Sequence, residues 1–136
     1  MLRLHIQPQS HLRYRQRAKA RATETPSREY AELLIGHAVQ SEGTQCTDLF
    51  ITDFEAMPQK VLKSERVEFW YPGSSNRILG YIHSHVEGTD CSPSERDWAQ
   101  TAGIAVVGIC TFLPTKTGLR ARTKFYAGSA LLTVED

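Results

Sequence analysis

Cysteine is scarce in this sequence, with three residues among 136 and no C-x-x-C spacing. An odd and widely spaced set of thiols does not suit a disulfide framework and is typical of a reducing compartment. The chain also lacks a run of roughly 18 apolar residues that a membrane helix needs, and its first residues lack the apolar core of a secretory signal. We therefore expect unbridged thiols at Cys46, Cys91 and Cys110 and a cytoplasmic protein.

Excess charge of one sign is also missing, because 16 Lys and Arg oppose 15 Asp and Glu. This balance gives no general argument for nucleic acid or for a membrane surface, so we predict neither as a partner. One basic stretch near the N-terminus contains Arg13, Arg15, Arg17, Lys19 and Arg21. Such a stretch is most commonly a solvated helix face, and a patch for phosphate or an acidic partner is the alternative.

The chain does contain enough apolar residues, 40% of the total, to build one hydrophobic core. No repeat, low-complexity tract or linker divides it, so we predict a single domain over residues 1–136. Residues 2–7 suggest an opening strand, and residues 33–36 are compatible with a buried strand that closes on a glycine. Five further segments carry β-branched or aromatic residues between turn residues and are predicted strands: 49–54, 66–71, 78–83, 104–112 and 120–126.

Two helices are predicted between these strands. The first has Ser10 as its N-cap, runs through the basic stretch and ends within residues 23–27. The second begins at residues 92–95, where serine, proline and glutamate suit the N-cap, the first helical position and a capping box, and it stops at Gly103. Strands and helices in this order predict an α+β or α/β layered domain with a curved mixed β-sheet flanked by helices.

The candidate site begins with two histidines at the end of a predicted strand. His83 and His85 are two residues apart, which is the period of a strand, so both imidazoles project from one face. Asp97 lies in the first turns of the following helix, within reach of the same point. Two imidazoles and one carboxylate leave a coordination position open, as in catalytic zinc sites, although the same ligands also suit iron.

Two further residues of this region have more than one interpretation. Ser94 lies three residues before Asp97, so the two side chains share a helix face. Its hydroxyl suits orienting an attacking water or donating to an oxyanion, and serine is also common at helix starts for structural reasons alone. Cys91 lies in the loop between the ligands, where an ordinary loop thiol is the commoner interpretation and a fourth zinc ligand the rarer one.

The segment HSH followed by SERD resembles the H-x-H…S-x-x-D motif of the JAMM/MPN-plus metalloproteases. That family motif also contains an upstream glutamate, in a segment like E-x-C-G-L-L-x-G. Residues 29–36, EYAELLIG, match this segment at the glutamate, the leucine pair and the final glycine. The chain departs from the family at Ala31 and Glu32, which replace Cys-Gly, and at Val86, where the family usually has proline.

The resemblance implies a single JAB/MPN-like domain with the layered architecture of cytidine deaminases, and a zinc metallopeptidase or isopeptidase. It implies one Zn²⁺ per chain, held by His83, His85 and Asp97. It also implies that Glu29 is the general base that activates a water at the metal and that Ser94 assists catalysis. Glu32 remains a weaker candidate for the base.

The resemblance further implies a substrate and partners. Family members cleave the bond after the C-terminal tail of ubiquitin or a ubiquitin-like protein, so such a protein or its conjugate is the expected substrate. Activating-enzyme-like or conjugating-enzyme-like proteins of the same system are further expected partners. The tail would lie extended beside an edge strand, held mainly by backbone hydrogen bonds.

Two alternatives remain beside this interpretation, and a third fails. A phage-tail or cell-wall peptidase would use the same motif on another substrate. A scaffold module of the same fold would bind a ubiquitin-like protein without cutting it. The segment from His85 to Glu87 also reads H-x-E, the opening of the zinc nucleobase-deaminase signature, but the P-C-x-x-C part of that signature is absent.

Overall fold

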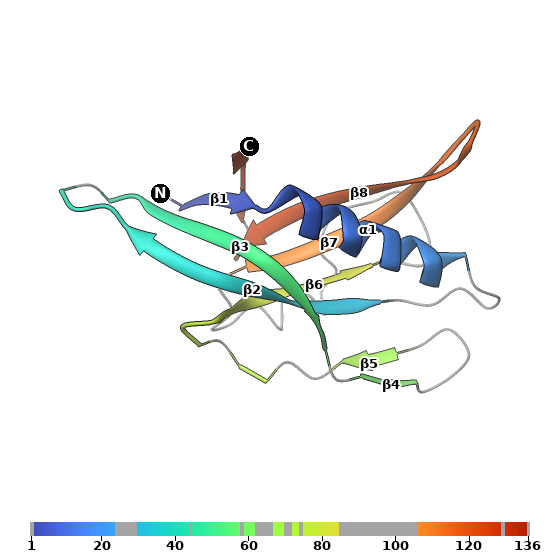
Figure 1. The fold of residues 1–136 in the computed structure, drawn as a ribbon, viewed down its shortest axis with the longest axis horizontal. Coiled ribbons are helices and arrows are strands. Elements are labelled where there is room, and N and C mark those ends of the chain that lie inside the picture. The colour runs from blue at the N-terminus through green and yellow to red at the C-terminus, as the bar shows by residue number, and fades with distance from the viewer. Residues whose placement is uncertain are drawn as a thin grey trace.

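A computed structural model describes residues 2–23, 30–43, 45–57, 59–61, 67–69, 72–73, 75–84, 106–128 and 130–135, and only the backbone at 59–61, 67–69 and 135. In this part of the chain, an eight-stranded sheet has the order β10-β1-β3-β2-β6-β7-β8-β9, and β4 pairs with β5 separately (Figure 1). The elements are β1 (Leu2–Ile6), α1 (Pro8–Ala22), β2 (Ala31–Gln40), β3 (Thr47–Ala56), β4 (Gln59–Val61), β5 (Val67–Phe69), β6 (Ile78–Ser84), β7 (Val106–Thr115), β8 (Gly118–Ala127), β9 (Ala130–Leu131) and β10 (Val134–Glu135).

The large sheet is mixed, which confirms the predicted fold class. Strand β1 is parallel to both β3 and β10, and β6 is parallel to β7. The remaining neighbours, including β2 with β3 and with β6 and β7 with β8, are antiparallel. The central strands β2, β6 and β7 are rich in buried apolar residues, which lie on both of their faces.

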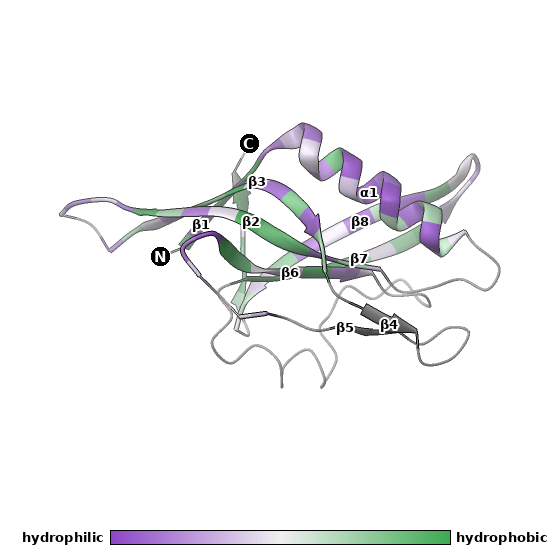
Figure 2. Cartoon of the chain, turned by 60° about the horizontal axis from the view of Figure 1, so that its bottom comes forward, coloured by the Kyte–Doolittle hydropathy of each residue, from purple (hydrophilic) through white to green (hydrophobic). Residues whose placement is uncertain are grey.

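Helix α1 covers one face of the sheet (Figure 2). Its buried residues Tyr14 and Ala18 belong to a core cluster with side chains from six strands of the sheet, among them Leu34 and Ile82. Residues of alternate parity on β2, β6 and β7, together with Met57 just after β3, form a second cluster on the opposite face: Ala31, Leu33, Ile35, Met57, Tyr81 and Val107. Because successive side chains of a strand point to opposite faces, this division fixes which residues can meet the candidate site.

The start of α1 differs from the prediction that Ser10 is its N-cap. Gln7 is the N-cap, and its side chain accepts a hydrogen bond of 2.5 Å from the Ser10 backbone N–H. Pro8 then occupies the first helical position, where its fixed φ and missing N–H cost nothing. Ser10 is instead buried inside the helix, and its hydroxyl donates to the Thr52 carbonyl at 3.0 Å. The predicted end of the helix is confirmed, since Thr23 is the C-cap.

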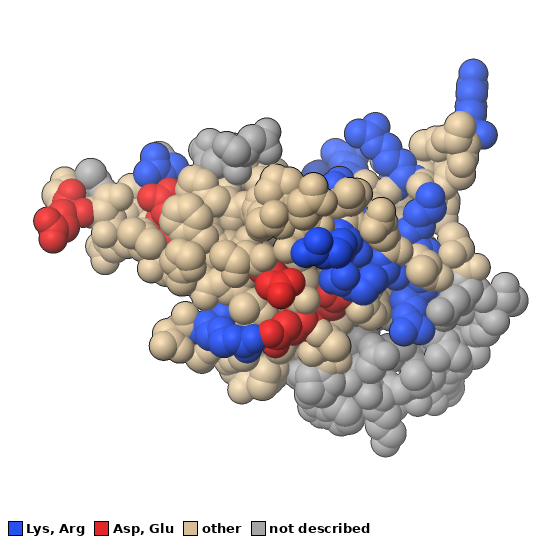
Figure 3. Space-filling model, in the orientation of Figure 1, with Lys and Arg blue, Asp and Glu red and all other residues tan. Residues whose placement is uncertain are grey.

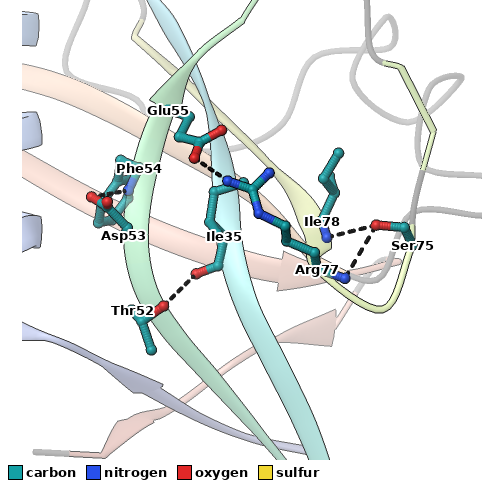
Figure 4. Close-up of polar contacts among 8 residues, drawn as sticks. All are labelled: Ile35, Thr52, Asp53, Phe54, Glu55, Ser75, Arg77 and Ile78. Carbon is teal, nitrogen blue, oxygen red and sulfur yellow. Dashed lines mark hydrogen bonds and ion pairs between the residues drawn. The ribbon is translucent and has the colours of Figure 1, made fainter.

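Strand β2 is longer than the prediction that it closes on Gly36. It continues to Gln40 and has a register irregularity between Ile35 and Gly36, where a side chain on Gly36 would lie 1.7 Å from the Phe50 carbonyl oxygen. Next to this irregularity the Thr52 hydroxyl donates to the Ile35 carbonyl at 3.3 Å (Figure 4). Glycine is thus needed here for close backbone approach and not for ending the strand.

The turn that leads into β6 is held by side chains, as Figure 4 also shows. The Ser75 hydroxyl accepts from the backbone N–H groups of Arg77 and Ile78, at 3.1 and 3.0 Å. The Arg77 guanidinium forms an ion pair with Glu55 on β3. These contacts set where β6 begins, and therefore where its last residues lie.

Some of the other sequence predictions agree with the structure and some do not. Each predicted strand overlaps an observed one, but the two-residue strands β9 and β10 and the three-residue β4 were not predicted. The predicted helix after Ser92 lies outside the described residues. Cys46 and Cys110 are in the thiol form. Among the described residues, no helix is long and apolar enough to cross a membrane.

Candidate metal centre

His83 lies at the end of β6, in the middle of the large sheet. It pairs with Ala31 on β2 and with Ile109 on β7. Its imidazole is partly buried and meets the Tyr81 ring edge to face, with 5.7 Å between the centroids. Ala31 and Tyr81 belong to the cluster on the face opposite α1, so His83 projects from that face.

The ends of two chain segments meet beside His83. The Ser84 backbone N–H donates to the Tyr30 carbonyl at 2.8 Å, and the Tyr30 N–H donates to the Ser84 hydroxyl, also at 2.8 Å. The serine side chain therefore replaces a backbone carbonyl in the last rung of the β2–β6 ladder. As a result, the chain enters β2 and leaves β6 at the same sheet edge, on hydrogen-bonded neighbouring strands.

Glu32, the weaker candidate for the general base, does not face His83. It pairs with Ile82 across the ladder and therefore lies on the α1 side of the sheet. Its side chain is 1% exposed, and both carboxylate oxygens accept from the Arg17 guanidinium, at 2.6 and 2.7 Å. A carboxylate that is buried and held on both oxygens has no capacity left to act on a water across the sheet. This geometry leaves Glu29 as the candidate.

Three groups near Glu32, namely Arg17, Tyr30 and Tyr14, stay in one protonation state at neutral pH. The hydrogen bonds to Glu32 raise the pKa of Arg17 above its already high ordinary value. Burial, followed by the hydrogen bond to Glu32, raises the pKa of Tyr30 to about 12. Burial also raises the pKa of Tyr14 well above 10. Groups with these shifts neither take nor release protons near pH 7, so they are structural.

Most of the predicted site cannot be placed, because Glu29, His85, Cys91, Ser94 and Asp97 lie outside the described residues. Among the described residues, no group of three His, Cys, Asp or Glu side chains could hold a metal ion. Of the predicted ligands only His83 has a position, and its place at a strand end agrees with the prediction. The ligand set suits zinc by its chemistry, since two imidazoles and a carboxylate are common zinc ligands.

The sequence prediction missed two contacts that shape this region. One is the Arg17–Glu32 ion pair, which joins α1 to β2. The other is the use of the Ser84 hydroxyl as a backbone substitute for Tyr30. A glutamate within an apolar strand was a usable sign of the first contact, because a buried carboxylate needs a cationic partner. Nothing in the sequence pointed to the second.

The described architecture is that of a JAB1/MPN domain. A JAB1/MPN domain protein from Archaeoglobus fulgidus is 16% identical and matches over 98% of this chain and 99% of its own, with a TM-score of 0.57. A protein from Desulfitobacterium hafniense, solved in solution, is 12% identical and matches over 98% and 93%, with a TM-score of 0.54. Functionally curated proteins give no match.

The family follows from the sequence match. Residues 11–124 match the model of the prokaryotic homologs of the JAB domain, and this chain belongs to that family. The match includes the segments that carry Glu29, His83, His85, Ser94 and Asp97.

Proposed function

We propose that this protein is a zinc-dependent peptidase or isopeptidase that hydrolyses the bond after the C-terminal tail of a ubiquitin-like protein. Family membership supports a metalloprotease-like role. The H-x-H…S-x-x-D motif with its upstream glutamate supports a complete catalytic set in this chain. The ubiquitin-like substrate and the zinc ion are parts of the proposal.

One structural observation carries the proposal: Ala31 and His83 are direct partners in an antiparallel ladder. Counting two residues outward along the sequence from each partner reaches Glu29, before the start of β2, and His85, after the end of β6. Side chains two residues apart on a strand share a face, so this register would bring Glu29, His83 and His85 together. Glu29 and His85 are outside the described residues, and their meeting is an expectation of the proposal.

The roles of the residues follow from their chemistry. His83, His85 and Asp97 would hold the metal ion, which supplies Lewis acidity and lowers the pKa of a nearby water to about 7. Glu29 would accept the proton of the attacking water and return it to the leaving amine, which needs a carboxylate not occupied by another cation. Ser94 would donate to the oxygen on which negative charge develops.

The first experiment measures metal content by elemental analysis. Wild type is compared with His85→Ala and with His37→Ala, a matched change at a histidine that stacks on Phe50 away from the site. The proposal expects about one zinc per chain in wild type and in His37→Ala. It also expects loss of zinc in His85→Ala. A folded wild-type protein without metal would contradict the proposal.

The second experiment separates catalysis from binding. The substrates are ubiquitin-like proteins with a short peptide extension after the terminal glycine, and cleavage is followed by mass spectrometry. Glu29→Gln should lower turnover by about 10²- to 10⁴-fold, the usual contribution of a general base, while leaving zinc content and substrate binding unchanged. If Glu29→Gln changes nothing and wild type binds without cleaving, the protein is a binding module.

A further inference from the structure

We propose that the outer edge of β8 binds an extended acidic polypeptide as an added strand. This site is separate from the candidate metal centre and independent of the proposed function. At a strand spacing of roughly 4.8 Å, an added strand would lie about 14 Å from β6. The inference depends on the open edge of β8, the charge around it and a buried arginine donor.

In the part of the chain that the structure describes, the edge of β8 is open over most of its length. On its outer side β8 pairs with β9 only at Tyr126 and Ala127, and the Leu132 N–H donates to the Phe125 carbonyl at 2.8 Å. This bond shows that Phe125 directs its backbone groups outward. Since the pattern repeats every two residues, Leu119, Ala121 and Thr123 also present N–H and C=O groups outward. Within the described residues, no strand pairs with these groups.

The surface around this edge carries charge of one sign. Helix α1 and the β7–β8 hairpin contain nine of the 16 Lys and Arg residues and none of the 15 Asp and Glu residues. Figure 3 shows these basic side chains gathered where α1 and the hairpin lie. Outside these segments the chain is therefore acidic on balance, and its net charge of +1 hides this separation. An acidic partner is the one that matches this surface.

One side of α1 runs along β8. The His11 imidazole lies 2.9 Å from the Thr123 hydroxyl, and the Lys19 ammonium lies 4.0 Å from where a side chain on Gly118 would begin. Arg15 is midway between them, at the four-residue spacing that puts all three on one helix face. This face and the β8 edge enclose a cleft of about 390 Å³, which is lined by Arg15, Leu113, Arg120, Ala121, Arg122 and Thr123.

Arg15 distinguishes this edge from one that is merely protected by charge. Exposed basic residues on an edge strand commonly prevent unwanted pairing, and Arg120 alone would fit that explanation. The Nε atom of Arg15, however, is buried, and it has no hydrogen-bond partner among the described residues. A buried donor without an acceptor is costly. A carboxylate bound in the cleft would pair with the Arg15 guanidinium and offset this cost.

The strand geometry defines the partner. Arg120 and Arg122 project from one face of β8, and Ala121 faces α1. In an antiparallel added strand, a glutamate opposite Ala121 would exchange backbone hydrogen bonds with it and point its side chain toward Arg15. Its neighbours in the added strand would direct glutamates toward Arg120 and Arg122. The expected ligand thus has a central glutamate with an acidic residue directly before and directly after it. Further acidic residues follow outward at every second position.

The probe is a fluorescein-labelled peptide, TETEEETET, whose binding is followed by anisotropy at low salt. Its control is EEEEETTTT, which has the same composition without the alternation. The central glutamate and the other odd positions would pair with β8, so N-methylation at positions 5 and 7 should abolish binding. N-methylation at positions 4 and 6, whose N–H groups would face away, should leave it. Because this comparison uses the wild-type protein, it does not depend on whether a variant folds.

A protein variant tests the arginine separately. Arg15→Met should weaken peptide binding about tenfold or more, because a hydrogen bond to a charged group contributes about 1.5–3 kcal/mol. Arg13→Met removes the same charge from the same helix outside the cleft and should change binding little. Equal binding of the two peptides, or indifference to N-methylation, would overturn the proposal. Binding of a single-stranded oligothymidylate in place of the peptide would overturn it too and assign the surface to nucleic acid.

Discussion

Arg17 and Glu32 form an ion pair with two hydrogen bonds, which connects α1 to β2, the strand that begins beside the candidate metal centre. Arg17 lies on α1 with a side chain 42% exposed, and Glu32 lies on β2 with a side chain 1% exposed. The pair is therefore asymmetric: solvent reaches the cation, whereas the anion is buried and has Arg17 as its positively charged partner. Glu32 is next to Ala31, the partner of His83, so this pair also fixes the position of the site.

Replacing Arg17 by Met should destabilise the protein by about 3 kcal/mol, because it leaves a buried carboxylate without a counterion. The free energy of unfolding in urea measures this effect. Arg13→Met is the matched control; it removes one hydrogen bond to the Ser10 hydroxyl but leaves no buried charge, so it should cost only about 1 kcal/mol.

The double variant Arg17→Met with Glu32→Leu removes both charges and should recover most of the lost stability, since an apolar pair of similar volume is often as stable as a buried ion pair. A double variant as unstable as the single one would show that the loss comes from packing and not from the unpaired charge.

Replacing Ser84 by Ala should cost about 1–3 kcal/mol, because the Tyr30 N–H then loses its hydroxyl acceptor. The loss should be local. Amide hydrogen exchange is the measurement, and the Tyr30 amide should exchange faster while amides in β3 keep their protection. Ser84→Thr keeps the hydroxyl and should preserve slow exchange at Tyr30. Fast exchange at Tyr30 already in wild type would contradict the predicted contact.

An element of the fold could be predicted from the sequence where neighbouring residues determine it, and could not where a contact with a distant strand determines it. Strands such as β6 were predicted because their β-branched and aromatic residues are followed or preceded by turn residues. Ser10 was misassigned as a cap because serine suits that position locally, whereas Pro8 sets the actual start of the helix. The continuation of β2 past Gly36 depends on the Phe50 carbonyl of another strand, which no local pattern contains.

The same distinction applies to the site. The β-branched and aromatic residues of segment 78–83, bounded by turn residues, were enough to predict that His83 ends a strand. The exclusion of Glu32 required its partner Arg17, which lies 15 residues earlier on α1. Family resemblance ranked Glu29 above Glu32, and the structure supplies the physical reason, because Glu32 lies on the other face of the sheet and is already bound.

Gly80→Ala should prevent folding or destabilise the protein severely. A side chain at Gly80 would lie 1.7 Å from the Val106 carbonyl oxygen in the parallel β6–β7 pair, and neither backbone can move without breaking the ladder. Gly43→Ala is the comparison. Its side chain would meet nothing within 4 Å, but its φ of 71° is unfavourable for alanine, so we expect a loss of about 1 kcal/mol. Thermal unfolding should rank wild type, Gly43→Ala and Gly80→Ala in that order.

The stability of the protein should fall between pH 6.5 and pH 4 because of His11. Burial, and secondarily the charge of Arg15, lowers the pKa of His11 from 6.5 to about 4. Above pH 6.5 the imidazole is neutral in both states, and the full stability is present. Between the two pKa values only the unfolded state takes up the proton, so the free energy of unfolding decreases as the pH falls. Below pH 4 both states are protonated, and this loss is complete.

A shift of this size corresponds to roughly 3 kcal/mol, and partial exposure of His11 reduces the expected loss to about 2 kcal/mol. Urea unfolding of wild type and His11→Gln at pH 7 and pH 5 isolates the effect, because carboxylates contribute equally to both proteins. The variant should lose less stability on acidification than wild type. A direct titration of the His11 ring by NMR decides the cause: a midpoint near 6.5 would contradict burial beside Arg15, and a midpoint near 4 would support it.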